Sequence, residues 1–239
     1  MAKICISDKE ESEKNLYYIQ SGTAEILSST GSRFDVALLG SRALLSIDCP
    51  DNYFDIVRAE VSDKVAEVIT IKYKYDFYKK RLPLSGLSKI EKEILITSLI
   101  AADLEDDKRY AFERVKEDTE ISIDGIFNFR LKALKRKWEE VVSYIPSGFL
   151  TEQMNEFISY LLENKKKRVY VDGGRVYDAY FRRLKRTELL EVDSNGILLE
   201  VLLSNCGVVE LNGKIPETDE KYLKEFYGDK IIFSNSNFS

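Results

Sequence analysis

The stretch "IDGIFNFRLKALKRKWEEVVSYI", residues 123–145, decides how the middle of this chain folds. Its apolar residues from Phe127 to Ile145 follow one another at spacings of four, three, four, three and four. At about 100° per residue, side chains with these spacings fall on one line along an α-helix. We therefore expect a single helix that packs through one apolar seam, formed by Phe127, Leu131, Leu134, Trp138, Val141 and Ile145.

The same stretch is crowded with basic residues, in an otherwise acidic chain. On the helical wheel these residues lie opposite the seam or beside it, where a core helix carries its solvated charges. They are Arg130, Lys132, Lys135, Arg136 and Lys137. We interpret them as the solvent-exposed face of a core helix, and a nucleic-acid-binding helix is the alternative.

Phe129 lies on the charged side of this helix, away from the seam. A large aromatic ring in that position should contact something. We expect it to pack against a second element, such as the long N-terminal helix, because a helix in the middle of a domain usually touches two neighbours. The alternative is that Phe129 contacts a partner protein.

The composition excludes several chemistries. The 239 residues include no histidine, which removes His-based triads and His metal sites. The three cysteines are far apart and odd in number, so neither a zinc site nor a disulfide framework is expected. "GVVELNGK" (207–214) lacks the spacing of a phosphate-binding loop. We assign no catalytic residue, cofactor or metal ligand, although carboxylate or Tyr chemistry stays possible.

The start of the chain, "MAKICISDKEES", has no apolar core of signal-peptide length. The most apolar run, residues 94–104, is too short to span a bilayer and is typical of a buried helix. We expect a soluble cytoplasmic protein with no membrane partner.

The N-terminal part shows strand and helix signals. "KICIS" (3–7) predicts a strand, and Ser7 with Glu10 predicts a capping box that opens a helix. Residues 33–49 predict two strands around the turn Leu39-Gly40-Ser41. A three-to-four-residue apolar period from Asn52 predicts a long helix that ends near Lys80.

Two further helices are expected in the middle of the chain. Ser88 and Glu91 form a second capping box, which opens an apolar helix that continues through a charged segment. Pro146-Ser147-Gly148 breaks the basic helix, and a matching apolar seam begins at Leu150. We expect these two helices to be antiparallel neighbours whose seams face each other.

The last quarter returns to a strand pattern. Residues 168–181 predict a hairpin that turns at Gly173-Gly174, with Val171 opposite Val176 and Tyr170 opposite Tyr177. A helix at about 195–205 follows. The strand "GVVEL", a helix at 218–227 and the strand "KIIFS" then predict a parallel βαβ unit.

These elements predict an α+β fold. It consists of a small N-terminal α/β part (1–82), a central antiparallel helical layer (83–166), and a C-terminal β-hairpin with a βαβ unit (167–239). These boundaries are soft, and the chain forms one or two folding units.

Charge is distributed unevenly along the chain. Residues 130–186 carry a local charge of +7, whereas the remainder carries −12. Aromatic residues alternate with the basic ones in 165–186, a combination that suits phosphates and stacked bases but also a merely soluble sheet face. The candidate contacts with a polyanion are Arg136, Lys165, Lys166, Lys167, Arg168, Tyr170, Arg175, Tyr177, Arg182 and Arg183.

Three motifs carry a family resemblance. They are "ISIDG" at 121–125, "FNFRLK" at 127–132 and "EFISYLL" at 156–162. With them, the segment 121–171 resembles the YtxC-like sporulation proteins of endospore-forming bacteria, and the remainder to the C-terminus is similar in layout. The resemblance implies a cytoplasmic protein of a spore-former with sporulation as its setting, and it implies no reaction.

We therefore expect a non-enzymatic protein that acts through macromolecular contacts, with a protein partner, in the sporulation setting. The alternative is nucleic-acid or polyanion binding through the basic aromatic hairpin 165–186. A third reading is a His-free enzyme that uses carboxylate or Tyr chemistry.

Overall fold

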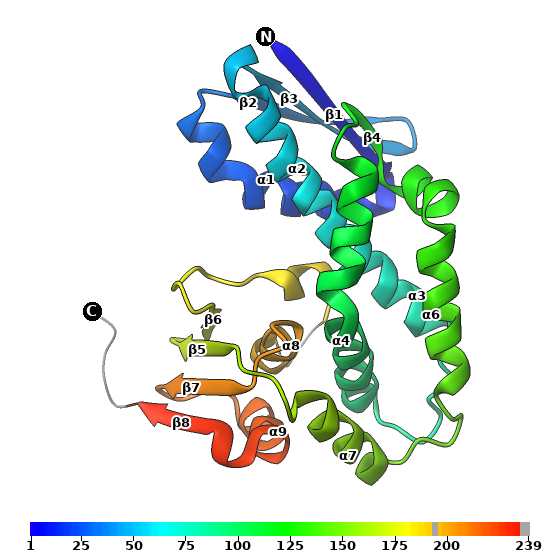
Figure 1. Ribbon diagram of the computed structural model, residues 1–239, viewed down its shortest axis with the longest axis vertical. Helices are drawn as coiled ribbons and strands as arrows, with labels where there is room; N and C mark the ends of the chain where they lie inside the picture. The colour runs from blue at the N-terminus through cyan, green and yellow to red at the C-terminus, as the bar shows by residue number, and fades with distance from the viewer. Residues whose placement is uncertain (193–195, 235–239) are drawn as a thin grey trace. The chain divides into compact units, whose positions relative to one another are not determined.

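The computed structural model describes residues 1–192 and 196–234 and has an α+β fold (Figure 1). The chain divides into two compact units. Unit 1 consists of Met1–Asp76 and Leu104–Val141, and unit 2 consists of Phe77–Asp103 and Val142–Ser239. Each unit thus combines segments that are distant in sequence, and each contains one four-stranded mixed sheet.

The sheet of unit 1 has the order β2-β3-β1-β4. β1 is antiparallel to β3 and parallel to β4. Alternate side chains on the two central strands, such as Ile6 and Leu45, are fully buried, which leaves the residues between them on the other face. The strands are β1 (Ala2–Lys9), β2 (Arg33–Leu39), β3 (Arg42–Cys49) and β4 (Glu120–Ser122).

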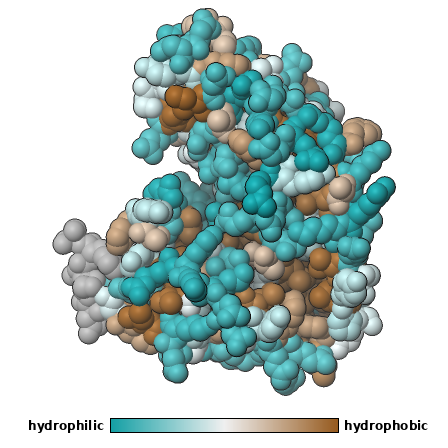
Figure 2. Space-filling model, in the orientation of Figure 1, coloured by the Kyte–Doolittle hydropathy of each residue, from teal (hydrophilic) through white to brown (hydrophobic). Residues whose placement is uncertain are grey.

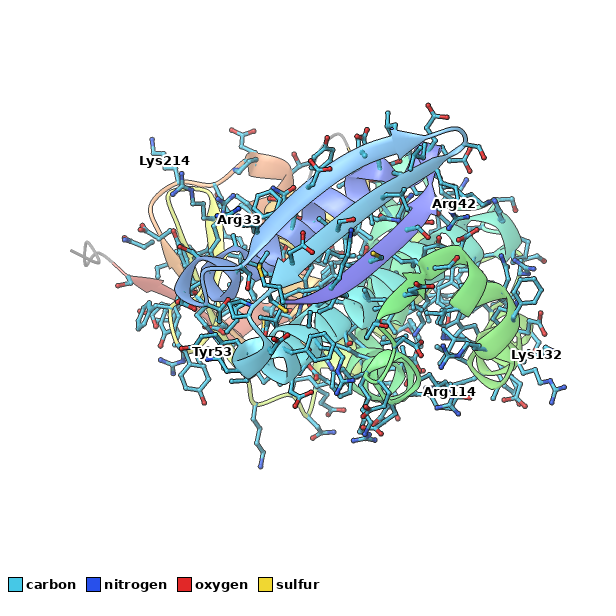
Figure 3. The ribbon with its side chains drawn as sticks, turned by 90° about the horizontal axis from the view of Figure 1, so that it is seen from above. Arg33, Arg42, Tyr53, Arg114, Lys132 and Lys214 are labelled. Carbon is cyan, nitrogen blue, oxygen red and sulfur yellow. The ribbon has the colours of Figure 1, made fainter. Side chains whose placement is uncertain are left out.

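Two helices complete the N-terminal layer of unit 1. α1 (Glu13–Ser29) packs on β1 and β3, and α2 (Phe54–Val68) packs on α1. Figure 3 looks onto the opposite face of the sheet, with α1 behind the strands. The strand and hairpin predictions for 3–7 and 33–49 are confirmed.

The capping box predicted for Ser7 and Glu10 is wrong. Ser7 lies inside β1, and Asp8 and Lys9 still pair with β3. The ladder therefore extends past the expected helix start, and α1 begins only at Glu13 after a short 3-10 turn. Backbone pairing with an existing strand outweighs the local capping preference of Ser7.

The long helix predicted from Asn52 to about Lys80 is confirmed in extent, but it contains an unexpected π-helical turn. α2 passes through the π turn Ile69–Tyr73 into α3 (Lys74–Arg81). The second capping box is also confirmed. The Ser88 N–H donates to Glu91 Oε2 at 2.8 Å, the Glu91 N–H donates to Ser88 Oγ at 3.3 Å, and α4 (Lys89–Val115) follows.

A single helix over 123–145 is wrong. The segment consists of α5 (Ile123–Gly125), a π turn at Ile126–Arg130, and α6 (Lys132–Tyr144). Leu131 separates them, with the non-helical angles φ −107° and ψ 34°. A π turn holds more residues than an α turn, so the even spacing of the apolar residues does not reveal it. The seam is still interior at its centre, because Leu131, Leu134 and Trp138 are buried.

The sheet of unit 2 has the order β6-β5-β7-β8, with β5, β7 and β8 parallel to one another and β6 antiparallel to β5. α8 packs against β6 and α9 against β8, while α7 packs against α9. The strands are β5 (Arg168–Asp172), β6 (Arg175–Tyr177), β7 (Val208–Asn212) and β8 (Ile231–Ser234), and the helices are α7 (Thr151–Leu162), α8 (Gly196–Leu203) and α9 (Glu217–Tyr227).

The C-terminal predictions are confirmed. β5 and β6 turn at Gly173-Gly174 with Val171 opposite Val176, and β7-α9-β8 forms a parallel βαβ unit. The helix expected at 195–205 is α8, with residue 195 outside the described residues. α6 and α7 fall largely in different compact units, so their facing seams stay a prediction.

Candidate polyanion-binding face

The sheet of unit 2 has a buried face and an outer face. Val169, Val171, Val176, Val209 and Leu211 are buried on the first. Because successive side chains of a strand alternate, the residues between them form the second. This outer face consists of Arg168, Tyr170, Asp172, Arg175, Tyr177, Val208, Glu210, Asn212 and Ile232.

The aromatic residues of the outer face lie side by side. Tyr170 is paired with Tyr177 across the hairpin, as the sequence predicts. The Phe181 ring, from the loop after β6, stacks on Tyr170 with 4.7 Å between the ring centroids and an interplanar angle of 21°. Phe181 is 55% exposed and has a φ of +60°, a left-handed conformation that is uncommon for a residue with a side chain.

Asp178 builds the loop that presents Phe181. Its Oδ1 accepts hydrogen bonds from the N–H groups of Tyr180 and Arg182, and its Oδ2 accepts from Arg182 Nε, all at 2.9 Å. Burial raises the pKa of the Asp178 carboxyl, but the Arg182 and Tyr180 N–H groups outweigh burial and hold this pKa below its usual value. An isolated antiparallel β-bridge between Tyr177 and Arg183 closes the loop.

Positive charge surrounds the aromatic residues, and part of it is compensated. Arg168 lies 3.4 Å from Glu210 on the same face, and Arg182 pairs with Asp178. Such exposed pairs are weak, so a phosphate can compete for either guanidinium. Residues 165–186 hold nine Lys or Arg and two Asp or Glu, which leaves this segment strongly positive.

The far edge of the outer face is apolar. Ile232 on β8 is paired with Glu210 on this face and is 41% exposed. The next residue, Phe233, is 62% exposed but is paired with Leu211, so it lies on the opposite face of the sheet. Figure 2 shows apolar surface where Figure 1 draws β8. The sheet thus combines basic and aromatic residues on β5 and β6 with apolar surface on β8.

The structure brings together most of the predicted polyanion contacts. Arg168, Tyr170, Arg175 and Tyr177 share the outer face, Arg182 and Arg183 lie on the loop after β6, and Lys165, Lys166 and Lys167 lead directly into β5. Arg136 lies on α6 in unit 1, so it is not a part of this face.

Phe129 lies on the π turn of unit 1 and is 77% exposed. Our expectation that it packs against a second element is therefore wrong. The π turn and the break at Leu131 rotate this part of the segment away from the wheel of a straight helix. The exposed ring leaves the alternative, a contact with a partner protein.

The basic residues of the central stretch are not all solvated. Lys137 Nζ lies 2.8 Å from Oδ1 of the buried Asp107, and Arg130 hydrogen-bonds Asp118 and the Arg114 carbonyl. Lys132 and Arg136 are exposed, as expected for the solvent-exposed face of a core helix.

Unit 1 contains polar clusters that the sequence did not reveal. At one end of the sheet, Arg42 donates to Asp124 Oδ1 at 2.8 Å and to Ser7 Oγ at 2.9 Å (Figure 3). Next to it, Tyr73 donates to the buried Asp8 at 2.6 Å. Asp124 belongs to the "ISIDG" motif and comes shortly after β4, and Asp8 is the last residue but one of β1, which is parallel to β4. Both carboxylates therefore lie at the carboxyl ends of neighbouring strands.

The described residues contain neither a cluster of metal ligands nor a membrane-spanning helix. No three His, Cys, Asp or Glu side chains in residues 1–192 and 196–234 are grouped as metal ligands. In that same part of the chain, no helix has the length and hydrophobicity that a bilayer-spanning segment requires.

The comparisons with known proteins identify no family for this chain. No protein-family model and no curated protein matches the chain. Among solved structures it is similar to a "Predicted insulinase family protease from Yersinia pestis", at 14% sequence identity and a TM-score of 0.22. The match covers 95% of this chain and 43% of that one, so the chain spans less than half of that protein's length. A TM-score this low carries no argument about fold or function.

Proposed function

We propose that the protein binds single-stranded nucleic acid through the outer face of the unit 2 sheet. The observation that carries this proposal is the aromatic group Tyr170, Tyr177 and Phe181 on a sheet face with Arg168 and Arg175. Unstacked bases stack on aromatic rings, while the guanidinium groups attract the phosphates between them.

Several features favour a single strand over other polyanions. A duplex keeps its bases stacked inside, so the aromatic rings would gain little from it. A carbohydrate or inorganic polyanion uses the charges alone.

The test measures fluorescence anisotropy of a labelled single-stranded oligonucleotide at several salt concentrations. Binding should weaken steeply as salt rises, because each neutralised phosphate releases counterions. The variant Arg168→Glu/Arg175→Glu should abolish binding. The matched control Lys132→Glu/Arg136→Glu makes the same change in charge on α6 of unit 1 and should leave binding unchanged.

Two results would contradict this assignment. If the control weakened binding as much as the Arg168 and Arg175 reversals, only net charge would matter. The second result has two parts: heparin displaces the oligonucleotide, and Tyr170→Leu weakens the binding of neither heparin nor the oligonucleotide. The site would then be a general polyanion surface.

A second proposal concerns Phe129. The ring is 77% exposed on the π turn of unit 1, and exposed aromatic residues are enriched where proteins meet. We propose that it contacts a protein partner in the cytoplasm of a sporulating cell, the setting that the YtxC-like resemblance implies.

Co-purification from a sporulating culture tests the second proposal. A specific protein should be recovered with the wild type and with Ile56→Ser, which removes another exposed apolar side chain of unit 1, but not with Phe129→Ser. Recovery of the same protein with Phe129→Ser would show that the ring is not the contact.

A further inference from the structure

Unit 2 contains a pocket of about 260 Å³ that is separate from the aromatic group. The first turn of α8, the start of α9, the hairpin turn and the segment after β6 line it. Its charged or titratable lining residues are Arg175, Arg183, Lys185, Glu188, Glu200 and Asp219. Acidic and basic groups are thus equal in number around one small space.

Glu200 is a buried acid in this lining, with only 3% of the residue exposed. Its Oε2 accepts hydrogen bonds from the N–H and the Oγ1 of Thr187, both at 2.8 Å. Its Oε1 has no partner among the described residues. Thr187 thus fixes one carboxylate oxygen and leaves the other unsatisfied.

Asp219 repeats this arrangement on the first turn of α9. It is 1% exposed and accepts hydrogen bonds from the N–H groups of Ile197 and Leu198, at the start of α8. Its Oδ1 likewise has no partner within the part of the chain that the structure describes. Burial raises the pKa of both the Glu200 and the Asp219 carboxyls.

Leaving a buried carboxylate oxygen without a donor is costly, about 1–3 kcal/mol or more for a charged group. Two residues that line the same pocket each carry such an atom, so a ligand in the pocket would be placed to supply the missing donors. Hydroxyl groups are suitable, because acidic side chains commonly hold the hydroxyls of a ribose. The basic residues of the lining would meet an anionic group on the same ligand.

We propose that this pocket binds a small phosphorylated polyol, such as a sugar phosphate or a nucleotide. Its hydroxyls would donate to Glu200 and Asp219, and its phosphate would lie against Arg175, Arg183 and Lys185. An inorganic anion would use only the basic residues. A simple cation would use only the acids and would be repelled by the three basic side chains.

The inference does not depend on the proposed nucleic-acid site, because Glu200 and Asp219 belong to the pocket and not to the outer face. Their substitution should leave oligonucleotide binding unchanged. Arg175 lines the pocket and also lies on the outer face, so the two proposals are distinguished through Glu200 and Asp219, whose substitution should affect the pocket alone.

Calorimetry with ribose 5-phosphate as the probe tests the proposal, with ribose and inorganic phosphate as comparisons. Ribose 5-phosphate should bind more tightly than either comparison. Glu200→Gln keeps an oxygen for Thr187 but removes the charge, and it should weaken ribose 5-phosphate binding at least about tenfold, the effect of one lost hydrogen bond to a charged group. It should leave the affinity for inorganic phosphate unchanged.

Circular dichroism would reveal whether Glu200→Gln folds. If it does not, Arg183→Ala tests the same pocket, because the Arg183 side chain is exposed and its removal should not disturb the fold. It should weaken both ribose 5-phosphate and phosphate, whereas the control Arg182→Ala, outside the pocket lining, should weaken neither. The proposal is overturned if ribose 5-phosphate does not bind, if inorganic phosphate binds equally well, or if Glu200→Gln and Arg183→Ala both leave ribose 5-phosphate binding intact.

Discussion

Lys74 Nζ lies 2.6 Å from Asp107 Oδ2 inside unit 1, and both side chains are buried. Trp138 Nε1 donates to the same oxygen at 2.8 Å, and Lys137 Nζ donates to Oδ1 at 2.8 Å. Burial raises the pKa of the Asp107 carboxyl, but the Lys74 charge and the three donors outweigh it and hold this pKa below its usual value. Asp107, on α4, therefore connects the start of α3 to α6.

The first prediction concerns this buried pair. Asp107→Asn removes the negative charge of a buried ion pair with Lys74, so it should lower the free energy of unfolding by about 3–5 kcal/mol. Urea denaturation followed by the fluorescence of Trp138, the single tryptophan, measures this. The neighbouring Asp106→Asn, which breaks an exposed pair with Arg109, is the control and should have no measurable effect. If both variants lowered the free energy of unfolding equally, the buried pair would contribute no more to stability than the exposed pair.

The second prediction concerns acid. Because the pKa of Asp107 is lower in the folded state than the ordinary Asp value of 3.8, its stabilising contribution is present above that value and is lost as the pH falls toward the folded-state pKa. The difference in unfolding free energy between wild type and Asp107→Asn should therefore shrink below about pH 4. Urea titrations between pH 2.5 and pH 7 would check it, and a constant difference would contradict it.

Asp8 should behave in the opposite way. Burial raises its pKa above 3.8 in the folded state, despite the hydrogen bonds from Tyr73 and Asn15. Its contribution is therefore present below the unfolded value and is lost as the pH rises through the raised folded pKa. Asp8→Asn should remove this loss of stability, because the new amide carries no charge. The Asn15 side chain can rotate so that its oxygen accepts a hydrogen bond from that amide. The variant should gain stability relative to wild type as the pH rises from 3 to 7, and a constant or falling difference would contradict this.

Gly207 should not tolerate a side chain. A Cβ built at this position would lie 1.7 Å from the Lys165 carbonyl oxygen, and the Gly207 N–H donates to the Lys167 carbonyl at 2.8 Å. Neither backbone can move without breaking the entry to β5. Gly207→Ala should destabilise unit 2 by about 1–3 kcal/mol or more. Calorimetric unfolding would show it, with Gly148→Ala, which meets nothing within 4 Å, as the matched control.

Tyr170 should contribute stacking energy to oligonucleotide binding. Replacing Tyr170 with Leu keeps an apolar side chain but removes the aromatic ring, so binding should weaken by about 1–3 kcal/mol, the usual loss for one stacked base. Anisotropy at constant salt measures the loss. Tyr160→Leu removes an exposed ring from α7 in the same unit and should change nothing.

Local sequence predicts some of this structure well. The register of the 168–177 hairpin follows from Gly173-Gly174, because a two-residue turn fixes which residues face each other. The Ser88 and Glu91 capping box also needs only neighbouring residues. The apolar period correctly predicted that Leu134 and Trp138 are buried, but it could not predict the π turn at 126–130 or the break at Leu131.

Contacts between distant residues explain what the sequence did not reveal. Lys74 carries a charge, and no neighbour in the sequence shows that it is buried, since its partner Asp107 is on another helix. For the same reason, the helical wheel places Lys137 among the solvated charges, although it pairs with Asp107. Arg168 and Arg175 were predictable site residues because they share a hairpin, whereas Glu200 and Asp219 line one pocket only after α8 and α9 have packed.

The interleaving of the two compact units has a consequence for biosynthesis. Residues 77–103 emerge from the ribosome before residues 104–141, yet they belong to unit 2, most of which emerges last. Unit 1 therefore cannot close until Val141 has been translated, and the intervening segment must wait for the C-terminus. No single proteolytic cut can release either unit whole.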